Sequence, residues 1–199
     1  MKIIIILIST ILVNNVILAQ FLGICPFLGT SKKTSTAVGM GAAVIFVLVL
    51  ATLVTYLLNK YVLVTLNLQF LQTITFILVI AALVQMVEII LKKISPSLYT
   101  ALGVFLPLIT TNCCVLGVSL KVVGEGFIYG NNVGEAVIYA AGIAIGFALS
   151  LIIFSGIREH LDLMEAPEGT KGTPIALITA GILDMAFMGF GGLVYSINL

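Results

Sequence analysis

The feature that most constrains this chain is a series of apolar stretches, each about as long as a helix that crosses a lipid bilayer. They cover roughly residues 3–28, 37–58, 70–91, 98–120, 136–154 and 174–195. A membrane-crossing helix needs about 20 apolar residues. Only 9% of the residues are charged, against about a quarter in soluble domains. We therefore expect an all-α integral membrane protein with six transmembrane helices and no soluble domain.

The first stretch also has features of a signal peptide, with Ala19 as a conceivable cleavage position. It stays apolar as far as Leu28, however, and the large Ile17 would occupy the third position before the cut. We therefore treat it as a transmembrane helix. The net charge of +1, with no basic cluster, argues against nucleic acid as a partner. The lipid bilayer is the partner that the composition predicts.

The basic residues predict how six spans would be oriented. The side shared by loops one, three and five holds six of the nine lysines and arginines: Lys32, Lys33, Lys92, Lys93, Arg158 and Lys171. The other side holds Lys2, Lys60 and Lys121. Because cytoplasmic loops are enriched in such residues, we expect both termini outside. Loop five, taken as residues 158–173, is the only markedly polar stretch.

Spans one and four differ from the others because polar residues and prolines interrupt them. The interruptions are Asn14, Asn15, Gln20, Gly23 and Cys25-Pro26 in span one, and Pro107, Thr110-Thr111-Asn112-Cys113-Cys114 and Gly117 in span four. Lipid cannot satisfy the backbone groups that such residues release, so a broken helix survives where protein or a cavity covers it. We expect both helices to be broken at a buried site.

The two interrupted segments share a short motif. Residues 25–31 and 113–119 both read C-x-x-L-G-x-S, at an offset of 88 residues. Each half of the chain would hold three spans, an odd number, so the second half must cross the membrane in the opposite direction. We expect one transmembrane domain built as an inverted 3+3 repeat, roughly residues 1–95 and 96–199. Cys25 and Cys113 would then meet near the pseudo-two-fold axis.

The residues leave three roles open for these cysteines. Each can be a small apolar side chain, a disulfide partner or a metal ligand. Soft thiolates suit iron–sulfur centres, which normally take four cysteines. Two repeat-related cysteines supply half of that set, so a cluster would require another polypeptide. Asn112, Thr110 and Thr111 are then candidates for hydrogen bonds to the sulfur atoms, or for repairing the helix break.

Two features of the last spans complete the candidates. Asp184 lies in the middle of span six, where a charge is costly and often functional. It is a speculative ion-path residue, although protonation or a hydrogen bond to a neighbouring helix would also explain it. Gly142 and Gly146 form G-x-x-x-G, which predicts close helix packing.

The segments that carry the cysteines resemble a known family. Residues 12–29, which contain N-N-V-I-L-A-Q-F-L-G-I-C-P-F, and residues 105–118, which contain L-P-L-I-T-T-N-C-C-V-L-G, resemble the A-type subunits of the bacterial Rnf electron transport complex. The likeness extends over essentially the whole chain. Related proteins are the E-type subunits of the same complex and the D-type and E-type subunits of the sodium-translocating NADH:quinone reductase.

The resemblance implies a function. Such complexes pass electrons between ferredoxin and NAD, coupled to Na⁺ or H⁺ translocation, in the bacterial cytoplasmic (inner) membrane. The A-type and E-type subunits have opposite orientations and share an intramembrane [2Fe–2S] cluster. The ligands implied here are Cys25 and Cys113, with Cys114 less favoured because it departs from the pattern. The Rnf subunits B, C, D and G would be further partners.

We expect no complete active site on this chain. It has no glycine-rich dinucleotide fingerprint, so we expect no flavin or nicotinamide site. The alternative function is a secondary transporter with inverted repeats and no redox centre, which would bind a substrate near Asn14, Asn15 and Asn112.

Overall fold

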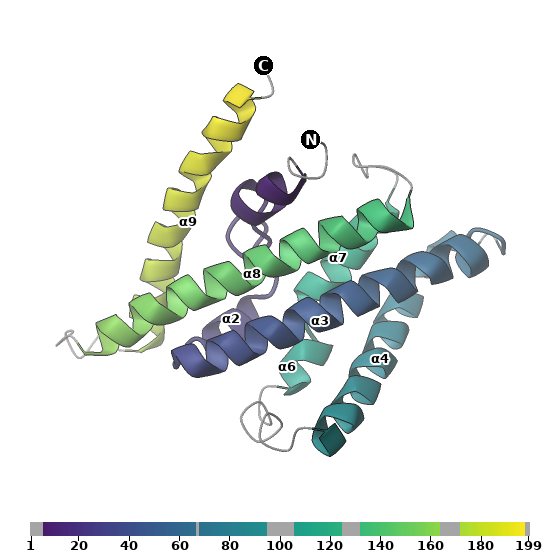
Figure 1. The fold of residues 1–199 in the computed structure, drawn as a ribbon, viewed down its shortest axis with the longest axis horizontal. Coiled ribbons are helices and arrows are strands. Elements are labelled where there is room, and N and C mark those ends of the chain that lie inside the picture. Colours follow the sequence, from purple (N-terminus) through teal and green to yellow (C-terminus); the bar gives the residue numbers. More distant parts are fainter. Residues whose placement is uncertain (1–5, 67, 95–105, 125–131, 164–171, 198–199) are drawn as a thin grey trace.

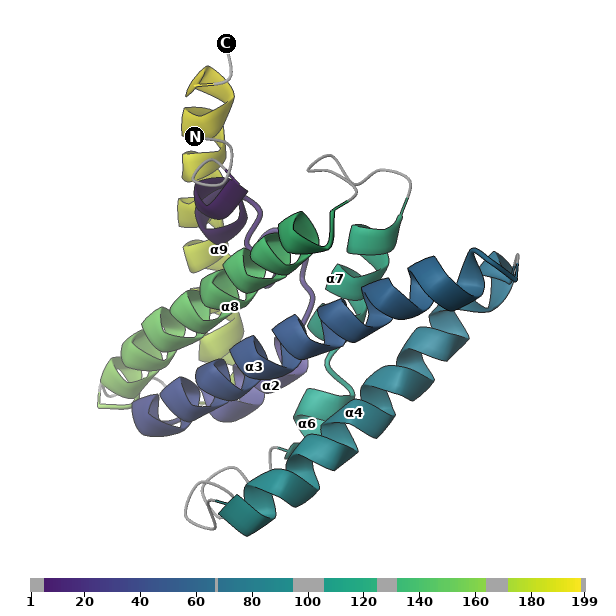
Figure 2. The ribbon, with the colours of Figure 1, turned by 45° about the vertical axis from the view of Figure 1, so that its right-hand side comes forward.

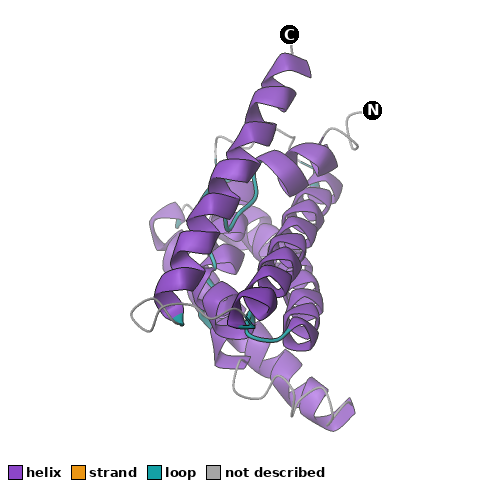
Figure 3. Ribbon diagram, turned by 90° about the vertical axis from the view of Figure 1, so that its left-hand side faces the viewer, coloured by secondary structure: helices purple, strands orange, loops and turns teal. Residues whose placement is uncertain are grey.

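The structure, a computed structural model, describes residues 6–66, 68–94, 106–124, 132–163 and 172–197, and this part contains helices and no strand. Figure 1 shows their arrangement. The elements in order are η1 Ser9–Val13, α2 Ile24–Thr30, α3 Thr34–Leu58, η2 Asn59–Leu63, η3 Gln69–Leu71, α4 Gln72–Ile94, α6 Leu106–Thr110, α7 Cys113–Val123, α8 Val133–Asp162 and α9 Thr173–Ile197. Figure 3 shows the helical character from another side. The expected all-α class is confirmed.

Several helices have the length and composition of membrane spans. Residues Thr34–Leu63, Gln69–Ile90 and Val133–Asp162 are long and apolar enough to cross a bilayer. Thr173–Gly189 is a shorter apolar segment, and so is Pro107–Val123, which comprises α6 and α7. At a rise of about 1.5 Å per residue, the longest of these exceed the hydrocarbon thickness of about 30 Å and must tilt or project. These helices fit an all-α membrane protein, while the number of six spans stays a prediction.

The centre of the molecule is the contact between α3 and α8, which lie side by side in Figures 1 and 2. Met40, Val44 and Leu48 of α3 and Phe147 and Leu151 of α8 are fully buried there. By contrast, α4 and α9 lie at the periphery and expose apolar side chains along much of their length. Exposed apolar faces of this kind suit lipid or a partner protein.

Two buried threonine hydroxyl groups of α3 bond to the preceding turn of their own helix. Thr52 Oγ1 donates to the Leu48 carbonyl at 2.8 Å, and Thr55 Oγ1 donates to the Ala51 carbonyl at 2.7 Å. Such bonds to the preceding turn satisfy a hydroxyl that hydrocarbon cannot solvate. These polar side chains therefore need no ligand to explain them.

The G-x-x-x-G motif of α8 packs closely, as its sequence predicts. A Cβ atom added at Gly146 would lie 3.1 Å from Ile11 Cα, and one added at Gly142 would overlap Thr10 Oγ1. The two glycines therefore let η1 of span one approach the backbone of α8.

The end of span five differs from the expectation. Helix α8 continues to Asp162, so Arg158, Glu159 and His160 are helical rather than part of loop five. Arg158 is buried because it continues the inward stripe of Phe147, Leu151 and Phe154. Arg158 still lies at the loop-five end of this helix, so the count of six cations against three for the predicted orientation is unchanged.

Candidate functional site

Span one is broken between residues 14 and 23, and Asn15 repairs the break. Its Nδ2 donates to the Gly146 carbonyl at 3.0 Å and to Ser150 Oγ, both on α8. Its Oδ1 accepts from the Ile17 backbone N–H at 3.1 Å. Because these groups are buried, the Asn15 amide substitutes for the missing helical bonds and ties the irregular segment to α8.

Helix α2 begins after Gly23, whose φ of +84° lies in the left-handed region. The Phe27 backbone N–H then bonds to the Gly23 carbonyl at 3.2 Å. Pro26 falls in the first turn, where its missing N–H costs no helical bond. Cys25 precedes it and its side chain is exposed.

Span four is broken between α6 and α7, and Asn112 is the N-cap of α7. Its backbone is extended and its Oδ1 accepts from the Cys114 backbone N–H at 3.0 Å. Thr111 Oγ1 donates to the Pro107 carbonyl at 3.0 Å, so it satisfies a backbone acceptor at the break. Asn112 Nδ2 is buried and has no hydrogen-bond partner among the described residues. The side chain of Thr110 lies outside the described part of the structure.

The three cysteines have different environments. Cys25 and Cys113 are exposed, and Cys114 is completely buried. All three are free thiols, so Cys25 and Cys113 form no disulfide in this structure. The exposed pair is the pair that the sequence motif relates.

The two broken helices meet at their starts. A Cβ atom on Gly23 would lie 3.1 Å from Asn112 Oδ1, 3.3 Å from Cys114 Cβ and 2.9 Å from Phe147 Cε2. The turns that begin α2 and α7 are therefore in contact, although they are far apart in the sequence. Each turn carries one exposed thiol, two residues after Gly23 in the first and directly after Asn112 in the second.

Two hollows flank these turns. One, of about 440 Å³, lies between α4 and α7 and is lined by Ile77, Ile80, Ala81, Gln85, Thr111, Asn112, Cys113 and Leu116. The other, of about 150 Å³, lies between span one and α9 and is lined by Ile17, Leu18, Phe21, Ile24, Phe27, Leu28, Leu177, Ala180, Gly181 and Asp184. Asp184 is half-buried, and the other side chains around the second hollow are apolar.

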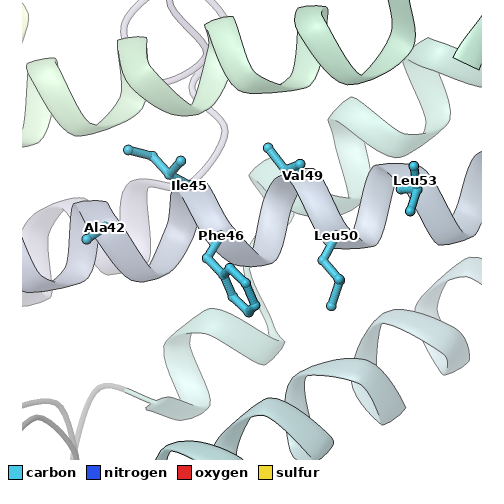
Figure 4. Close-up of a pocket in the computed structure, with 6 residues that line it drawn as sticks. All are labelled: Ala42, Ile45, Phe46, Val49, Leu50 and Leu53. Atoms are coloured by element: carbon cyan, nitrogen blue, oxygen red, sulfur yellow. The ribbon is translucent and has the colours of Figure 1, made fainter. Parts of the chain in front are cut away.

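A third hollow has an entirely apolar lining. It follows α3, has a volume of about 370 Å³ and is lined by Ala42, Ile45, Phe46, Val49, Leu50 and Leu53 (Figure 4). None of these side chains is polar or titratable, so the hollow suits a hydrocarbon group rather than a redox centre.

One notable polar residue was missed by the sequence reasoning. Arg158 is only 9% exposed, and its Nη1 donates to the Leu28 carbonyl and to Ser31 Oγ, both at 2.9 Å. The signal was the spacing on α8, since Arg158 lies four residues after Phe154 and eleven after Phe147. Because its neighbours in the sequence are polar, the sequence alone instead assigns Arg158 to loop five.

Comparison with known proteins finds relatives over nearly the whole chain. A family model described as Rnf-Nqr subunit, membrane protein, matches residues 3–194. The A subunit of the Na⁺-translocating ferredoxin:NAD⁺ oxidoreductase complex of Acetobacterium woodii is 54% identical over 97% of this chain and 98% of its own. The A subunit of the ion-translocating oxidoreductase complex of Syntrophotalea carbinolica is 54% identical over 97% of this chain and 98% of its own. The protein of the same description in Vibrio cholerae is 52% identical over 94% of this chain and 95% of its own.

Proposed function

This chain belongs to the Rnf-Nqr family of membrane subunits, and we propose that it serves in an ion-translocating ferredoxin:NAD oxidoreductase complex as a carrier of electrons through the membrane. Its relatives are named as the A subunits of such complexes over nearly its whole length. In our proposal Cys25 and Cys113 bind one side of an intramembrane [2Fe–2S] cluster. A paralogous subunit in the bacterial inner membrane supplies the other two thiolates.

The observation that carries the proposal is the contact between the two turns that present Cys25 and Cys113. A [2Fe–2S] cluster takes four cysteines, whereas this chain has three, one of which is buried. The described residues contain no group of three or more His, Cys, Asp and Glu side chains that could bind a metal. Two exposed thiols on adjoining turns fit half of a shared site.

The donor set around Cys113 fits a thiolate-bound cluster. A buried amide N–H without a partner costs free energy, and Asn112 Nδ2 is such a donor beside Cys113. Thiolate sulfur accepts hydrogen bonds, which would relieve that cost. When bound, the cluster would accept and release one electron, and Asn112 would hydrogen-bond to its sulfur atoms.

The two hollows support the inverted repeat. Ile77, Ile80 and Ala81 of α4 correspond to Leu177, Ala180 and Gly181 of α9 at an offset of 100 residues, with Gln85 and Asp184 at the far end. The first broken helix contributes Ile24 and Leu28 to one hollow, and the second contributes Asn112 and Leu116 to the other. Ile24 precedes Asn112 by 88 residues, and Leu28 precedes Leu116 by the same number. Such matching is what an inverted repeat would produce.

The rival function, a transporter without a redox centre, has less support. Asn15 already bonds to Gly146, Ser150 and Ile17 within the protein. Asn14 Nδ2 lies 3.4 Å from Ser9 Oγ. Of these three asparagines, Asn112 has the free donor, and that donor lies beside a cysteine.

The direct test is to purify this chain with its paralogous partner and analyse iron, sulfide and the electron paramagnetic resonance (EPR) spectrum after reduction. We expect iron and sulfide in equal amounts and a [2Fe–2S] signal. An iron-free preparation of the assembled pair would refute the proposed cluster and leave the transporter as the better function.

Replacing Asn112 with serine is expected to make the midpoint potential of the cluster more negative. Serine keeps the N-cap of α7 but removes the Nδ2 donor, and a lost hydrogen bond to sulfur destabilises the more negative reduced state. An EPR-monitored redox titration measures the shift. Thr111→Val is the control, since Thr111 Oγ1 already bonds to Pro107; an equal shift in both variants would contradict the role of Nδ2.

Replacing Asp184 with asparagine is expected to reduce ion translocation per electron while the [2Fe–2S] signal remains. The change replaces an ionisable carboxyl group on the wall of the hollow between span one and α9 with a neutral amide. Ion uptake and electron transfer are measured in proteoliposomes. Asp162→Asn, at the exposed end of α8, is the control; unchanged coupling in Asp184→Asn would exclude this residue from the ion path.

A further inference from the structure

Three side chains of α8 reach α2, at its start, its middle and its end. Phe147 lies under the start of α2, where it meets the position of a Gly23 Cβ atom at 2.9 Å. Phe154 stacks on Phe27 in the middle, with ring centroids 4.3 Å apart and planes inclined by 20°. Arg158 then reaches the end, where it donates to the Leu28 carbonyl. These three residues lie on one face of α8.

Arg158 hydrogen-bonds to the C-terminal end of α2, where a positive charge is favourable. The last carbonyls of a helix lack helical partners and form its negative pole. Nη1 of Arg158 donates at 2.9 Å both to the Leu28 carbonyl and to Ser31 Oγ, the residue that follows α2. The neighbouring Glu159 accepts a hydrogen bond from Thr34 Oγ1 at the start of α3. The end of α8 therefore fastens the turn that joins α2 to α3.

The shortness of α2 places Cys25 within one turn of the carbonyl that Arg158 binds. The helix has seven residues, and Cys25 is its second. Leu28 follows three residues later, which is about 4.5 Å along the helix axis at about 1.5 Å per residue. Arg158 is 9% exposed, so water screens its charge weakly. The charge of Arg158 is therefore fixed at the far end of the short helix that carries Cys25.

We propose that Arg158 is a positioning residue for Cys25 and that its buried charge raises the reduction potential of the centre bound there. The inference rests on the proposed function, because it concerns the cluster that Cys25 would bind. Reduction adds one negative charge, and a nearby cation stabilises the reduced form more than the oxidised form. Fastening α2 at its far end also restricts movement of the Cys25 thiol.

The experiment compares Arg158→Gln, Arg158→Lys and Ser31→Ala in the purified complex, with His160→Gln as control because His160 is exposed on the same helix end. Two properties are measured: the midpoint potential by EPR titration, and hydrogen exchange of the backbone amides of residues 24–31. Exchange reports on α2 whether or not a cluster is bound.

We expect Arg158→Gln to lower the midpoint potential and to accelerate exchange in residues 24–31 about tenfold, because a charged hydrogen bond is lost. Arg158→Lys keeps the charge, so the potential stays near that of the wild type while exchange accelerates. Ser31→Ala accelerates exchange less and leaves the potential unchanged. His160→Gln alters neither.

An unchanged potential and unchanged exchange in Arg158→Gln would overturn the inference. If that variant fails to assemble, unchanged exchange in both Ser31→Ala and Arg158→Lys overturns the positioning role. A wild-type complex without the [2Fe–2S] signal would instead refute the proposed function, and the exchange rates would still decide whether Arg158 fastens α2.

Discussion

Serine in place of Cys113 is expected to abolish the [2Fe–2S] signal and to reduce electron transfer by more than about 100-fold, and serine in place of Cys25 is expected to do the same. A hydroxyl group is a harder and more basic ligand than a thiolate and binds iron–sulfur centres poorly. Substitution of a residue that only hydrogen-bonds to a metal ligand already lowers metal affinity or activity about 10–100-fold. Loss of a ligand itself should therefore have a larger effect. EPR spectroscopy and ferredoxin-dependent NAD reduction measure the two effects.

The matched control for this experiment is Cys114→Ala. Cys114 is the adjacent residue, but its side chain is buried against the turn at Gly23. We expect the variant to keep the signal and most of the activity, with a loss of stability of about 1 kcal/mol for a small buried side chain. The reverse pattern, with signal lost in Cys114→Ala and kept in Cys113→Ser, would transfer the ligand role to Cys114.

The second large effect is expected for Gly23→Ala, which should prevent the turns of α2 and α7 from meeting correctly. A side chain at a φ of +84° costs roughly 1–2 kcal/mol. Its Cβ would also lie 2.9 Å from Phe147 Cε2, and overpacking of this kind costs about 1–3 kcal/mol. We expect a lower melting temperature of the complex and loss of bound iron.

Gly156→Ala is the control for adding a methyl group to a glycine without the strained backbone or the close contact. Gly156 lies within α8, has no atoms within 4 Å of an added Cβ and has no positive φ. Alanine favours a helix more than glycine does, so this variant should keep its iron and its melting temperature. Equal iron contents in Gly23→Ala and wild type would contradict the importance of the contact between the turns.

Much of the fold could be predicted from the sequence because membrane helices obey local rules. The apolar runs around α3, α4, α8 and α9 lie where the helices form, to within a few residues at most ends. The breaks in spans one and four follow from Asn14-Asn15 and from Pro107 with Asn112. The close approach of α8 and η1 follows from the spacing of Gly142 and Gly146.

Parts of the site could not be predicted in this way. Arg158 has the composition of a loop residue, and only its contacts with Leu28 and Ser31 show that it is buried. The repeated motif favours Cys113 over Cys114 as a ligand, but the sequence does not show which of the two thiols is exposed, because adjacent residues at the start of a helix point in different directions. Their exposure depends on where Gly23 and Phe147 lie.

The amino-acid sequence by itself determined that this chain is an all-α membrane protein of its family, because hydrocarbon tolerates few charges and no unpaired backbone, and because the cysteine motifs are specific. The tertiary structure alone decided which thiols are accessible, that the turns at Gly23 and Asn112 touch, and that Arg158 fastens the end of α2. These are contacts between residues about 90 or more positions apart, and local hydrophobicity carries no information about them.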